Sequence, residues 1–321
     1  MRAFLLALAL PTALGAAELN PVGPLPYDDS HPKPRAGCTH RLTGQIEADD
    51  LAKVQAIPTD PQVVLCLDSP GGAFRAGVQI GAFIRDAGIG TRLEENAICE
   101  SACALIFMSG SYVSDSPRYA LQPYGMTEEE EWLLGLQPWR TMHPTARLGF
   151  HAPRLTVPAG QYDEATVQRA YDIALLGLSE FTSQLMQPSD YESETVAWDP
   201  DLFARMIATP HDTMFYTDTV EKAGRYRIDI GPIANPPSAP DDRTLIRACA
   251  NAMGWGEGFG SYLYEDGIPG ATLRGTSLEL SNGLPCDFER GGRDSQWRMF
   301  RYDVPDITFF DPATPLAALA P

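Results

Sequence analysis

Residues 63–72 read V-V-L-C-L-D-S-P-G-G, and this stretch decides the fold expected for the chain. Its first five residues form a continuous apolar run, which is typical of a strand buried on both faces of a parallel sheet. Ser69, Pro70 and the two glycines then stop the strand, and apolar residues recur at helical spacing from Phe74 to Ala87. The stretch therefore predicts a strand that turns sharply into a helix.

A second turn of the same kind lies at residues 99–103, which read C-E-S-A-C. A strand is expected over Thr91 to Ile98 before it, and an apolar helix over Ala102 to Met108 after it. The first amides of a helix lack intrahelical partners and carry partial positive charge. A serine at one such turn and a glycine pair at the other suit a nucleophile beside an oxyanion hole.

The charge balance excludes some classes of partner. The chain has 321 residues, a net charge of −18 and a pI of about 4.6. This balance argues against binding to nucleic acid or to an anionic membrane surface. The sequence demands no metal or cofactor, because no Cys/His spacing in it is typical of a zinc site. Its three lysines are Lys33, Lys53 and Lys222.

Residues 1–17 are expected to be a secretory signal peptide. Arg2 is followed by an apolar run and then by small residues, with cleavage expected near Ala16 or Ala17. The apolar run is too short to span a bilayer comfortably, and no later segment is long enough. We therefore expect a periplasmic or secreted protein in an oxidising compartment, without a membrane span after cleavage.

Six cysteines fit an oxidising compartment, and an even number allows three disulfides. Cys249 and Cys286 are the favoured pair, because both lie in the C-terminal region. Cys99 and Cys103 are four residues apart on one helix face, where a bond is geometrically marginal. The full connectivity cannot be read from the spacing.

Alternating strands and helices with tight turns predict an α/β layer structure. Residues 18–37 are expected to be an extended lead-in, and residues 38–232 the main domain, with an insertion or lid at 114–145. A proline-rich linker is expected at 233–240, followed by a small β-rich region at 241–321 that a disulfide staples. The remaining elements expected in the main domain are strands at 38–46, 147–151, 214–215 and near 228, and helices at 48–57, 162–186, 201–208 and through 223–224. The long helix at 162–186 carries an apolar stripe that is typical of core packing.

These residues carry a resemblance to a known family. The run L-D-S-P-G-G at 67–72, followed by a serine at the head of an apolar helix, resembles the proteolytic subunit of the Clp protease. It is similar more broadly to the Clp/crotonase superfamily, and most closely to its secreted bacterial branch. Gly72 and Ser101 are 29 residues apart, which matches the family's spacing. The resemblance covers roughly residues 38–232 and implies a core of repeated β-β-α units wound as a spiral.

The resemblance also implies roles for five residues. Ser101 would be the nucleophile, His151 the general base and Asp212 the acid that orients the histidine, in the family's order along the chain. The backbone amides of Gly72 and Ala102 would form the oxyanion hole. The insertion before His151 lengthens the separation between the serine and the histidine.

Other interpretations of the same residues remain open at this point. Ser101 could be an ordinary helix N-cap, and the glycine pair an ordinary turn. His143 is a rival for the base, and Asp201 and Asp218 are rivals for the acid, although Asp218 is expected to cap the next helix. Glu100 departs from the family's pattern, and its carboxylate could either affect the base or face water.

The function expected from the resemblance is a secreted serine peptidase that cleaves peptides or protein loops without an ATPase partner. A catalytically inactive binding module, with recognition through the C-terminal region, is the alternative. A crotonase-type acyl-CoA enzyme is disfavoured by the signal peptide, and a serine–lysine dyad by the scarcity of lysine. The helix at 162–186 corresponds to the element that mediates ring assembly in the family, so a homo-oligomer is a further expectation.

Overall fold

The computed structural model describes residues 16–25, 37–58, 63–114, 135–154, 160–186, 198–235, 240–255, 272–274, 277–279, 285–290, 297–299, 302–303 and 305–321. The predicted signal peptide, except Ala16 and Ala17, lies outside these ranges, as do most of the predicted insertion and residues 236–239 of the predicted linker.

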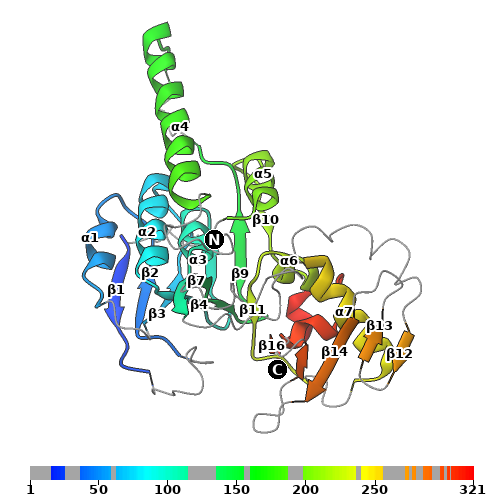
Figure 1. The fold of residues 1–321 in the computed structure, drawn as a ribbon. Coiled ribbons are helices and arrows are strands. Elements are labelled where there is room, and N and C mark those ends of the chain that lie inside the picture. Colours follow the sequence, from blue (N-terminus) through cyan, green and yellow to red (C-terminus); the bar gives the residue numbers. More distant parts are fainter. Residues whose placement is uncertain are drawn as a thin grey trace, which may run out of the picture.

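The larger sheet has six strands in the order β1-β2-β3-β4-β8-β11 (Figure 1). The strands are β1 Glu18–Pro21, β2 His40–Thr43, β3 Val64–Asp68, β4 Gly90–Leu93, β8 Arg140–Met142 and β11 Asp229–Ile230. β1 runs antiparallel to β2, and all other neighbouring pairs are parallel. The buried parallel strand predicted from residues 63–67 is therefore confirmed as β3, in the interior of the sheet.

A smaller sheet has the order β10-β9-β5, with β5 Ile98–Glu100, β9 Arg147–Phe150 and β10 Phe215–Tyr216. β5 is parallel to β9, and β10 is antiparallel to it. The chain that leaves β3 connects the two sheets. Ser69 forms a parallel bridge with Cys99 in β5, and Gly72 forms one with Ile46 beyond β2.

Three helices cover the large sheet: α1 Asp50–Gln55, α2 Phe74–Asp86 and α3 Ala102–Met108. Every residue of α3 is buried. α2 approaches it closely because two glycines face it. A Cβ on Gly77 would lie 2.8 Å from the Ala102 carbonyl oxygen, and one on Gly81 would lie 2.7 Å from the Ser109 Oγ. The predicted helices are confirmed here, and the predicted end of α2 at Gly88 has a φ of 67°.

The next helices are α4 Glu164–Leu185, α5 Pro200–Ala208 and α6 Val220–Arg225. α4 begins at Asp163, whose carboxylate accepts a hydrogen bond from the Thr166 amide. Its C-terminal half packs against α2, whereas its N-terminal half projects from the body of the molecule (Figure 1). The predicted buried stripe is therefore wrong for most of the helix, because only Phe181 and Leu185 are buried.

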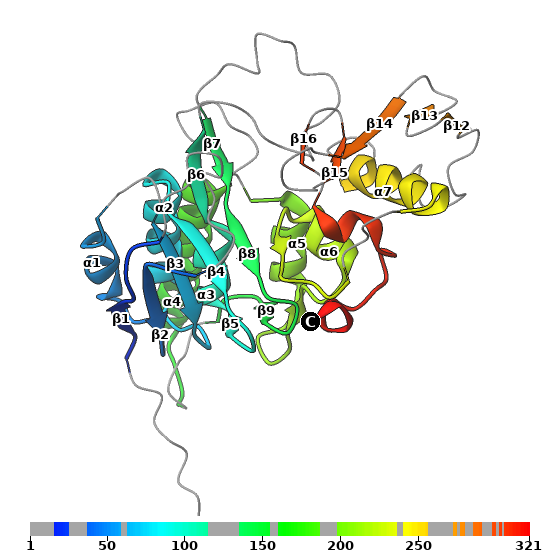
Figure 2. The same ribbon diagram turned by 90° about the horizontal axis from the view of Figure 1, so that it is seen from below.

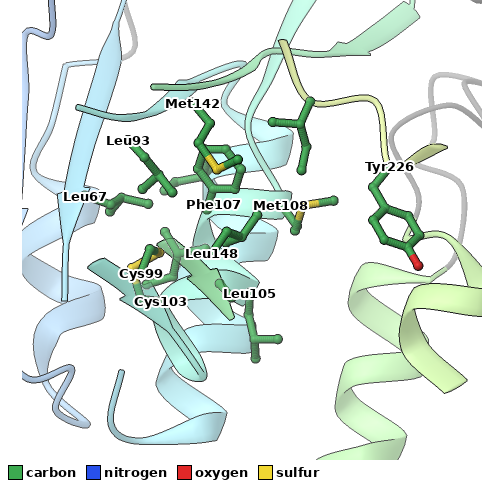
Figure 3. Packing of buried hydrophobic residues seen from close by; sticks show 14 of the residues in the cluster. Leu67, Leu93, Cys99, Cys103, Leu105, Phe107, Met108, Met142, Leu148 and Tyr226 are labelled. Carbon is green, nitrogen blue, oxygen red and sulfur yellow. A yellow bond between two sulfur atoms is a disulfide. The ribbon is translucent and has the colours of Figure 1, made fainter. Parts of the chain in front are cut away.

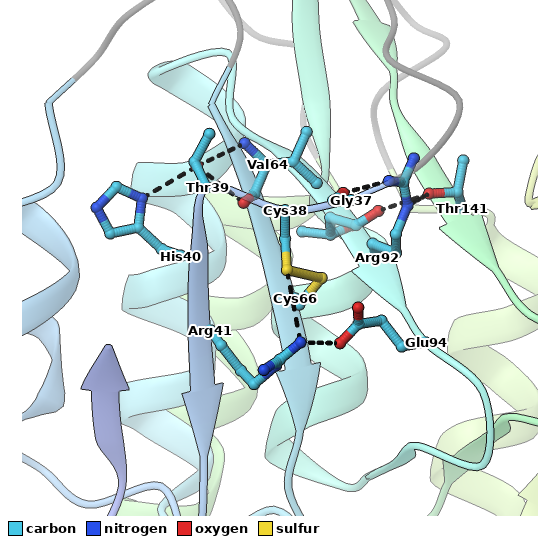
Figure 4. Close-up of a disulfide and its surroundings, with 11 residues drawn as sticks. Gly37, Cys38, Thr39, His40, Arg41, Val64, Cys66, Arg92, Glu94 and Thr141 are labelled. Carbon is cyan, nitrogen blue, oxygen red and sulfur yellow. Dashed lines mark hydrogen bonds and ion pairs between the residues drawn. A yellow bond between two sulfur atoms is a disulfide. The ribbon is translucent and has the colours of Figure 1, made fainter. Parts of the chain in front are cut away.

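The core lies between α3 and the strands around it. Leu67, Leu105, Phe107 and Leu148 meet there, beside the disulfide between Cys99 and Cys103 (Figure 3). Successive side chains of a strand point to opposite faces. Cys66 of β3 therefore lies on the other face from Leu67, in a second small cluster (Figure 4).

The disulfides include one that the sequence did not indicate. Cys99 and Cys103 are bonded, with their Cα atoms 5.1 Å apart, as the spacing allowed. A second bond joins Cys38, two residues before β2, to Cys66 of the neighbouring strand β3, and no pattern in the sequence pointed to it. Cys249 is also disulfide-bonded. The Cys286 side chain lies outside the described residues, so that pairing stays a prediction.

The C-terminal region contains a helix as well as strands. α7 Asp242–Trp255 was not predicted, whereas β-rich structure was, and it forms an antiparallel sheet. The sheet has the order β12-β13-β14-β15-β16 and consists of β12 Thr272–Arg274, β13 Ser277–Glu279, β14 Pro285–Arg290, β15 Trp297–Met299 and β16 Tyr302–Asp303. The chain ends in two 3-10 helices, η3 Asp306–Phe309 and η4 Leu316–Leu319. These segments lie beside α6 (Figures 1 and 2), where the Val220 amide donates to the Thr314 carbonyl at 3.0 Å.

Three predicted boundaries are wrong. The lead-in at 18–37 contains β1, and Ala17 before it is buried, with its carbonyl accepting a hydrogen bond from the Lys53 ammonium at 2.9 Å. The strand expected over 91–98 is two strands, β4 and β5. The insertion expected over 114–145 extends too far, because residues 140–142 form β8 of the large sheet. Its edges form a hairpin of β6 Ser111–Ser114 and β7 Gly135–Pro138.

None of the helices in the described ranges has both the length and the apolar character needed to cross a bilayer.

Candidate active site

Ser101 forms the whole connection between β5 and α3. Its φ is 57° and its ψ is −122°, a conformation that L-residues other than glycine rarely adopt. Such a residue costs about 1–3 kcal/mol and persists only where the surroundings enforce it. The Ser101 side chain does not cap α3. The ordinary N-cap interpretation of Ser101 is therefore wrong, and its hydroxyl is not committed to the helix.

The glycine pair packs between this serine and Ile46, with Gly71 against the serine and Gly72 against Ile46. A Cβ on Gly71 would lie 2.7 Å from the Ser101 Cβ and 2.5 Å from the Glu100 carbonyl oxygen. A Cβ on Gly72 would lie 2.1 Å from the Ile46 carbonyl oxygen. Their φ values are 96° and 150°, in the region that favours glycine. Neither position tolerates a side chain, because the turn passes between the end of β2 and the serine.

Two backbone amides lie at this junction. The Ile46 amide donates to the Gly71 carbonyl, and the Ile46 carbonyl accepts from the Ala73 amide, each at 2.8 Å. This pattern directs the Gly72 N–H to the opposite side of the chain from Ile46. Ala102 is the first residue of α3, so its amide has no intrahelical acceptor. Gly72 and Ala102 stay the predicted pair of oxyanion donors.

His151 follows the last residue of β9, next to the strand that ends at the serine. Glu100 pairs with Gly149, and the Ser101 amide donates to the Gly149 carbonyl at 3.0 Å. The His151 Nδ1 lies 2.7 Å from the Ala152 carbonyl oxygen. A carbonyl can only accept, so Nδ1 carries the proton and Nε2 is left as the acceptor. This tautomer is the one that a general base needs.

Asp212 lies in the turn that precedes β10, on the far side of β9 from the serine. The Ala152 amide donates to Thr209 at 2.9 Å, and the Thr213 amide donates to Pro210, which closes the turn. The Asp212 side chain is exposed, and no hydrogen bond joins it to another residue of the described ranges. The role predicted for Asp212 therefore stays a prediction, and in the structure the partner of the His151 Nδ1 is the Ala152 carbonyl.

These segments lie side by side in a fixed order. The chain at Ser69 pairs with β5, β5 with β9, and β9 with β10. The glycine turn, Ser101, His151 and Asp212 follow that order across one end of the sheet. Chain segments far apart in the sequence therefore end at the same side of the small sheet.

Glu100, which the resemblance did not explain, belongs to a polar cluster on the small sheet. Its Oε1 accepts hydrogen bonds from Arg147 at 2.7 Å and from the Tyr216 hydroxyl at 2.9 Å. Glu100 and Tyr216 lie on either side of Gly149, whose missing side chain leaves room for Tyr216 and Met214. The Tyr216 hydrogen bond and the Glu100 charge raise the pKa of Arg147 above its ordinary value. Glu100 is therefore paired rather than free beside the serine.

The rival residues are engaged elsewhere. Although burial acts to raise it, hydrogen bonds from Arg205 and Tyr226 hold the pKa of Asp201 below its ordinary value. Asp218 pairs with Lys222 at 2.6 Å, and Thr219, not Asp218, caps α6. His143 contacts Thr145 in its own turn.

Both lysines in the described ranges are held in ion pairs. Lys53 pairs with Asp50 and Lys222 with Asp218, each at 2.6 Å and each within one helical segment. Lys33 lies outside the described residues.

A metal site is not assigned. Within the described ranges, Cys38, Cys66 and Glu94 are the group whose ligand-type atoms lie close enough together to suggest one. The two sulfur atoms are bonded to each other, so neither is a thiolate (Figure 4). Glu94 instead pairs with Arg41.

The sequence missed Arg147 and Tyr216 as partners of Glu100, the residue before Ser101. Alternation along residues 147–151 could have placed Arg147 on the outer face of its strand. Nothing local could have paired it with Glu100 or Tyr216, because the cluster depends on the strand order.

A scan of the chain against profiles of known protein families finds no match, and a search of curated protein sequences finds none either.

Proposed function

We propose that the chain is a secreted or periplasmic serine hydrolase, specifically a Clp-like serine peptidase that cleaves peptides or exposed protein loops. The observation that carries the proposal is the conformation of Ser101: a serine alone connects a strand to a helix, at positive φ, without capping that helix. A strained strand–serine–helix turn exposes the hydroxyl of nucleophilic serines in other hydrolases. Strained backbone of this kind clusters at active sites and ligand clamps, which supports a functional role for Ser101.

The proposed reaction is acyl transfer in two steps. The His151 Nε2 takes the proton of the Ser101 hydroxyl as Oγ attacks the substrate carbonyl. The Gly72 and Ala102 amides hold the oxyanion that forms, and the imidazolium then protonates the leaving amine as the C–N bond breaks. Water, activated by the same histidine, hydrolyses the acyl-enzyme. Asp212 is proposed as a supporting acid, and the scheme calls for no cofactor.

The finer features of the proposal rest on the resemblance. The fold proposed is the spiral core of repeated β-β-α units, and the mostly parallel sheet with α2 and α3 after its turns is compatible with it. Export is supported by the signal-like residues 1–17 and by the disulfides. No ATPase partner is proposed, because ATP is scarce outside the cytoplasm. The further partner proposed is a second copy of the chain.

Labelling with a fluorophosphonate, followed by intact-mass spectrometry, tests the proposal. We expect one adduct on the mature protein, none on Ser101→Ala, and at least a hundredfold slower labelling of His151→Ala. Ser109→Ala and His143→Ala are the matched controls, because each removes the same side chain outside the site, and both should label normally.

Each contrary result has a distinct meaning. If the adduct still forms on Ser101→Ala, the reactive residue is not Ser101 and the assignment of the nucleophile is wrong. A folded wild-type protein that takes no adduct would favour the alternative of a non-catalytic binding module.

A further inference from the structure

The two cysteines at the elbow occupy special positions relative to Ser101. In C-E-S-A-C, Cys99 and Cys103 stand two residues before and two residues after the serine. In the G-x-S-x-G elbow of other hydrolases, glycines stand at these same two positions. Glycine there lets the strand and the helix approach each other at the sharp turn. Here both positions carry a side chain, and the two side chains are bonded to each other.

The bond ties the strand to the helix across the nucleophile. Cys99 lies in β5 and Cys103 in the first turn of α3, with their Cα atoms 5.1 Å apart. Both residues are 0% exposed. The bond lies in the core next to Leu105 and Leu148 (Figure 3). The disulfide therefore closes a five-residue loop that contains Ser101 at its centre.

An elbow without this bond has an alternative conformation open to it. A serine before a helix ordinarily adopts the extended region and accepts a hydrogen bond from the second or third helical amide. Ser101 would then turn its hydroxyl to α3 and away from the site. The described contacts that oppose this change are the Gly149 carbonyl, which binds the Ser101 amide, and the packing of Gly71.

We propose that the Cys99–Cys103 disulfide is a positioning device that holds Ser101 in the elbow conformation. It fixes the separation of β5 and α3, which in G-x-S-x-G elbows depends on close packing of two glycines. This inference deepens the proposed function and rests on it for its catalytic meaning. The role assigned to the two cysteines is positioning, because neither sulfur is exposed to a substrate.

The test compares removal of this disulfide with removal of the other one. Cys99→Ala/Cys103→Ala should slow the maximal rate of fluorophosphonate labelling about tenfold or more and change the half-saturating probe concentration little. Cys38→Ala/Cys66→Ala is the matched control, because it removes another buried disulfide that does not flank Ser101. This control should label at the wild-type rate even if its melting temperature falls as far as that of Cys99→Ala/Cys103→Ala.

Amide hydrogen exchange on the same proteins gives a readout that does not need activity. Loss of the Cys99–Cys103 disulfide should speed hydrogen exchange of the Ser101 amide about tenfold. The reason is that the hydrogen bond from this amide to the Gly149 carbonyl breaks when Ser101 leaves the elbow conformation. The control variant should leave it unchanged. If Cys99→Ala/Cys103→Ala does not fold, Cys99→Val/Cys103→Ala keeps more of the buried volume and suits strand and helix.

The outcomes separate this inference from the proposed function. If Cys99→Ala/Cys103→Ala labels at the wild-type rate and its Ser101 amide exchanges at the wild-type rate, the disulfide does not position Ser101 and the inference is overturned. If the wild-type protein takes no adduct, the proposed function is overturned. The positioning role of the disulfide would still be supported if amide exchange were faster in Cys99→Ala/Cys103→Ala and not in the control variant. Equal slowing of labelling in both double variants would assign the effect to stability and overturn the inference.

Discussion

Glu100 places a carboxylate next to Ser101, the proposed nucleophile. A free Glu100 would repel the negative charge that develops on Ser101 and on the oxyanion. The Glu100 side chain is instead 17% exposed and paired with Arg147, and the Tyr216 hydroxyl binds the same oxygen. The cluster is neutral overall and joins all three strands of the small sheet. Its evident effect is to hold β5, β9 and β10 in register at the edge that carries the site.

His151 has two candidates for its orienting partner, and they predict different effects of one substitution. The Ala152 carbonyl already fixes the tautomer, so Asp212→Asn should slow fluorophosphonate labelling less than tenfold. Removing the acid of an established Ser-His-Asp triad costs about ten-thousandfold. Labelling rates of Asp212→Asn, with Asp218→Asn as the control, measure the difference. A loss above a thousandfold would show that Asp212 swings in to bind His151 during the reaction.

Arg140 of β8 is a buried cation with poor compensation. It is 3% exposed, its Nη1 has the Met108 sulfur at 3.7 Å as acceptor, and its Nε has no hydrogen-bond partner in the described ranges. Burial, with a contribution from the nearby Arg227, lowers the pKa of Arg140 to about 9. The charged form is therefore less favourable in the folded protein than in the unfolded chain.

This imbalance makes stability depend on pH. Above pH 9 Arg140 loses its proton in the folded protein but keeps it in the unfolded chain, so the unfolded chain binds more protons. The free energy of unfolding therefore increases as the pH rises beyond that value. Arg140→Met should stabilise the protein at pH 7 by about 1 kcal/mol or more, and this advantage should shrink at pH 10. Urea unfolding at both values measures it, with exposed Arg169→Met as the control. A variant that is less stable at pH 7 contradicts the expectation.

At the scale of elements, the sequence predicted what local pattern determines. The continuous apolar run of β3, the helical spacing of α2 and the apolar residues of α3 are strong signals, and glycines mark their ends. The same signals located Ser101, Gly72 and His151 at ends of elements, which is why they lie together once the strands pair. The glycines were identified as necessary, although their tight contacts with Ile46 and Ser101 were not visible.

Elements that depend on distant partners were missed. β1 contains Pro21 and is an edge strand whose pairing with β2 crosses about twenty residues, so no local periodicity announces it. The split between β4 and β5 falls at Asn96, whose φ is 59°, without a glycine or proline to signal a turn. Cys38 and Cys66 meet only because β2 and β3 are neighbours. The spacing of cysteines in the sequence contains no such information.

Across the whole molecule, the C-terminal segments contribute to the core rather than to the site. Trp255, Ile307, Leu316 and Leu319 belong to the same buried cluster as the residues around α3. A Cβ on Gly224 of α6 would lie 2.2 Å from the Trp255 ring, so α7 packs closely against the main domain. The candidate catalytic residues all come from residues 72–212. We therefore expect the end of the chain to act through stability, or through contacts beyond the site.

One surface of the molecule remains unexplained by internal packing. Five large apolar residues of α4 are 46–59% exposed, namely Val167, Tyr171, Ile173, Leu175 and Leu176. All five belong to α4, the helix whose N-terminal half projects from the body of the molecule (Figure 1). Such a concentration of apolar surface in a monomer normally marks an interaction site. The helix offers the same residues on every copy of the chain, so a symmetric association through α4 would cover them.

This association is the partner proposed above, and its prediction is a change of mass in solution. Light scattering with size-exclusion chromatography should give an oligomer for the wild-type protein at micromolar concentration. Tyr171→Glu/Leu175→Glu should give a monomer, because the two new charges would have to be desolvated at an apolar contact between copies. Its melting temperature should be unchanged, because both side chains are exposed in a single chain. Gln168→Glu, an exposed polar position on the same helix, should leave the oligomer intact. A wild-type protein that stays monomeric at 100 µM, a concentration on the order of the dissociation constants of weak complexes, would reject α4 as a self-association surface.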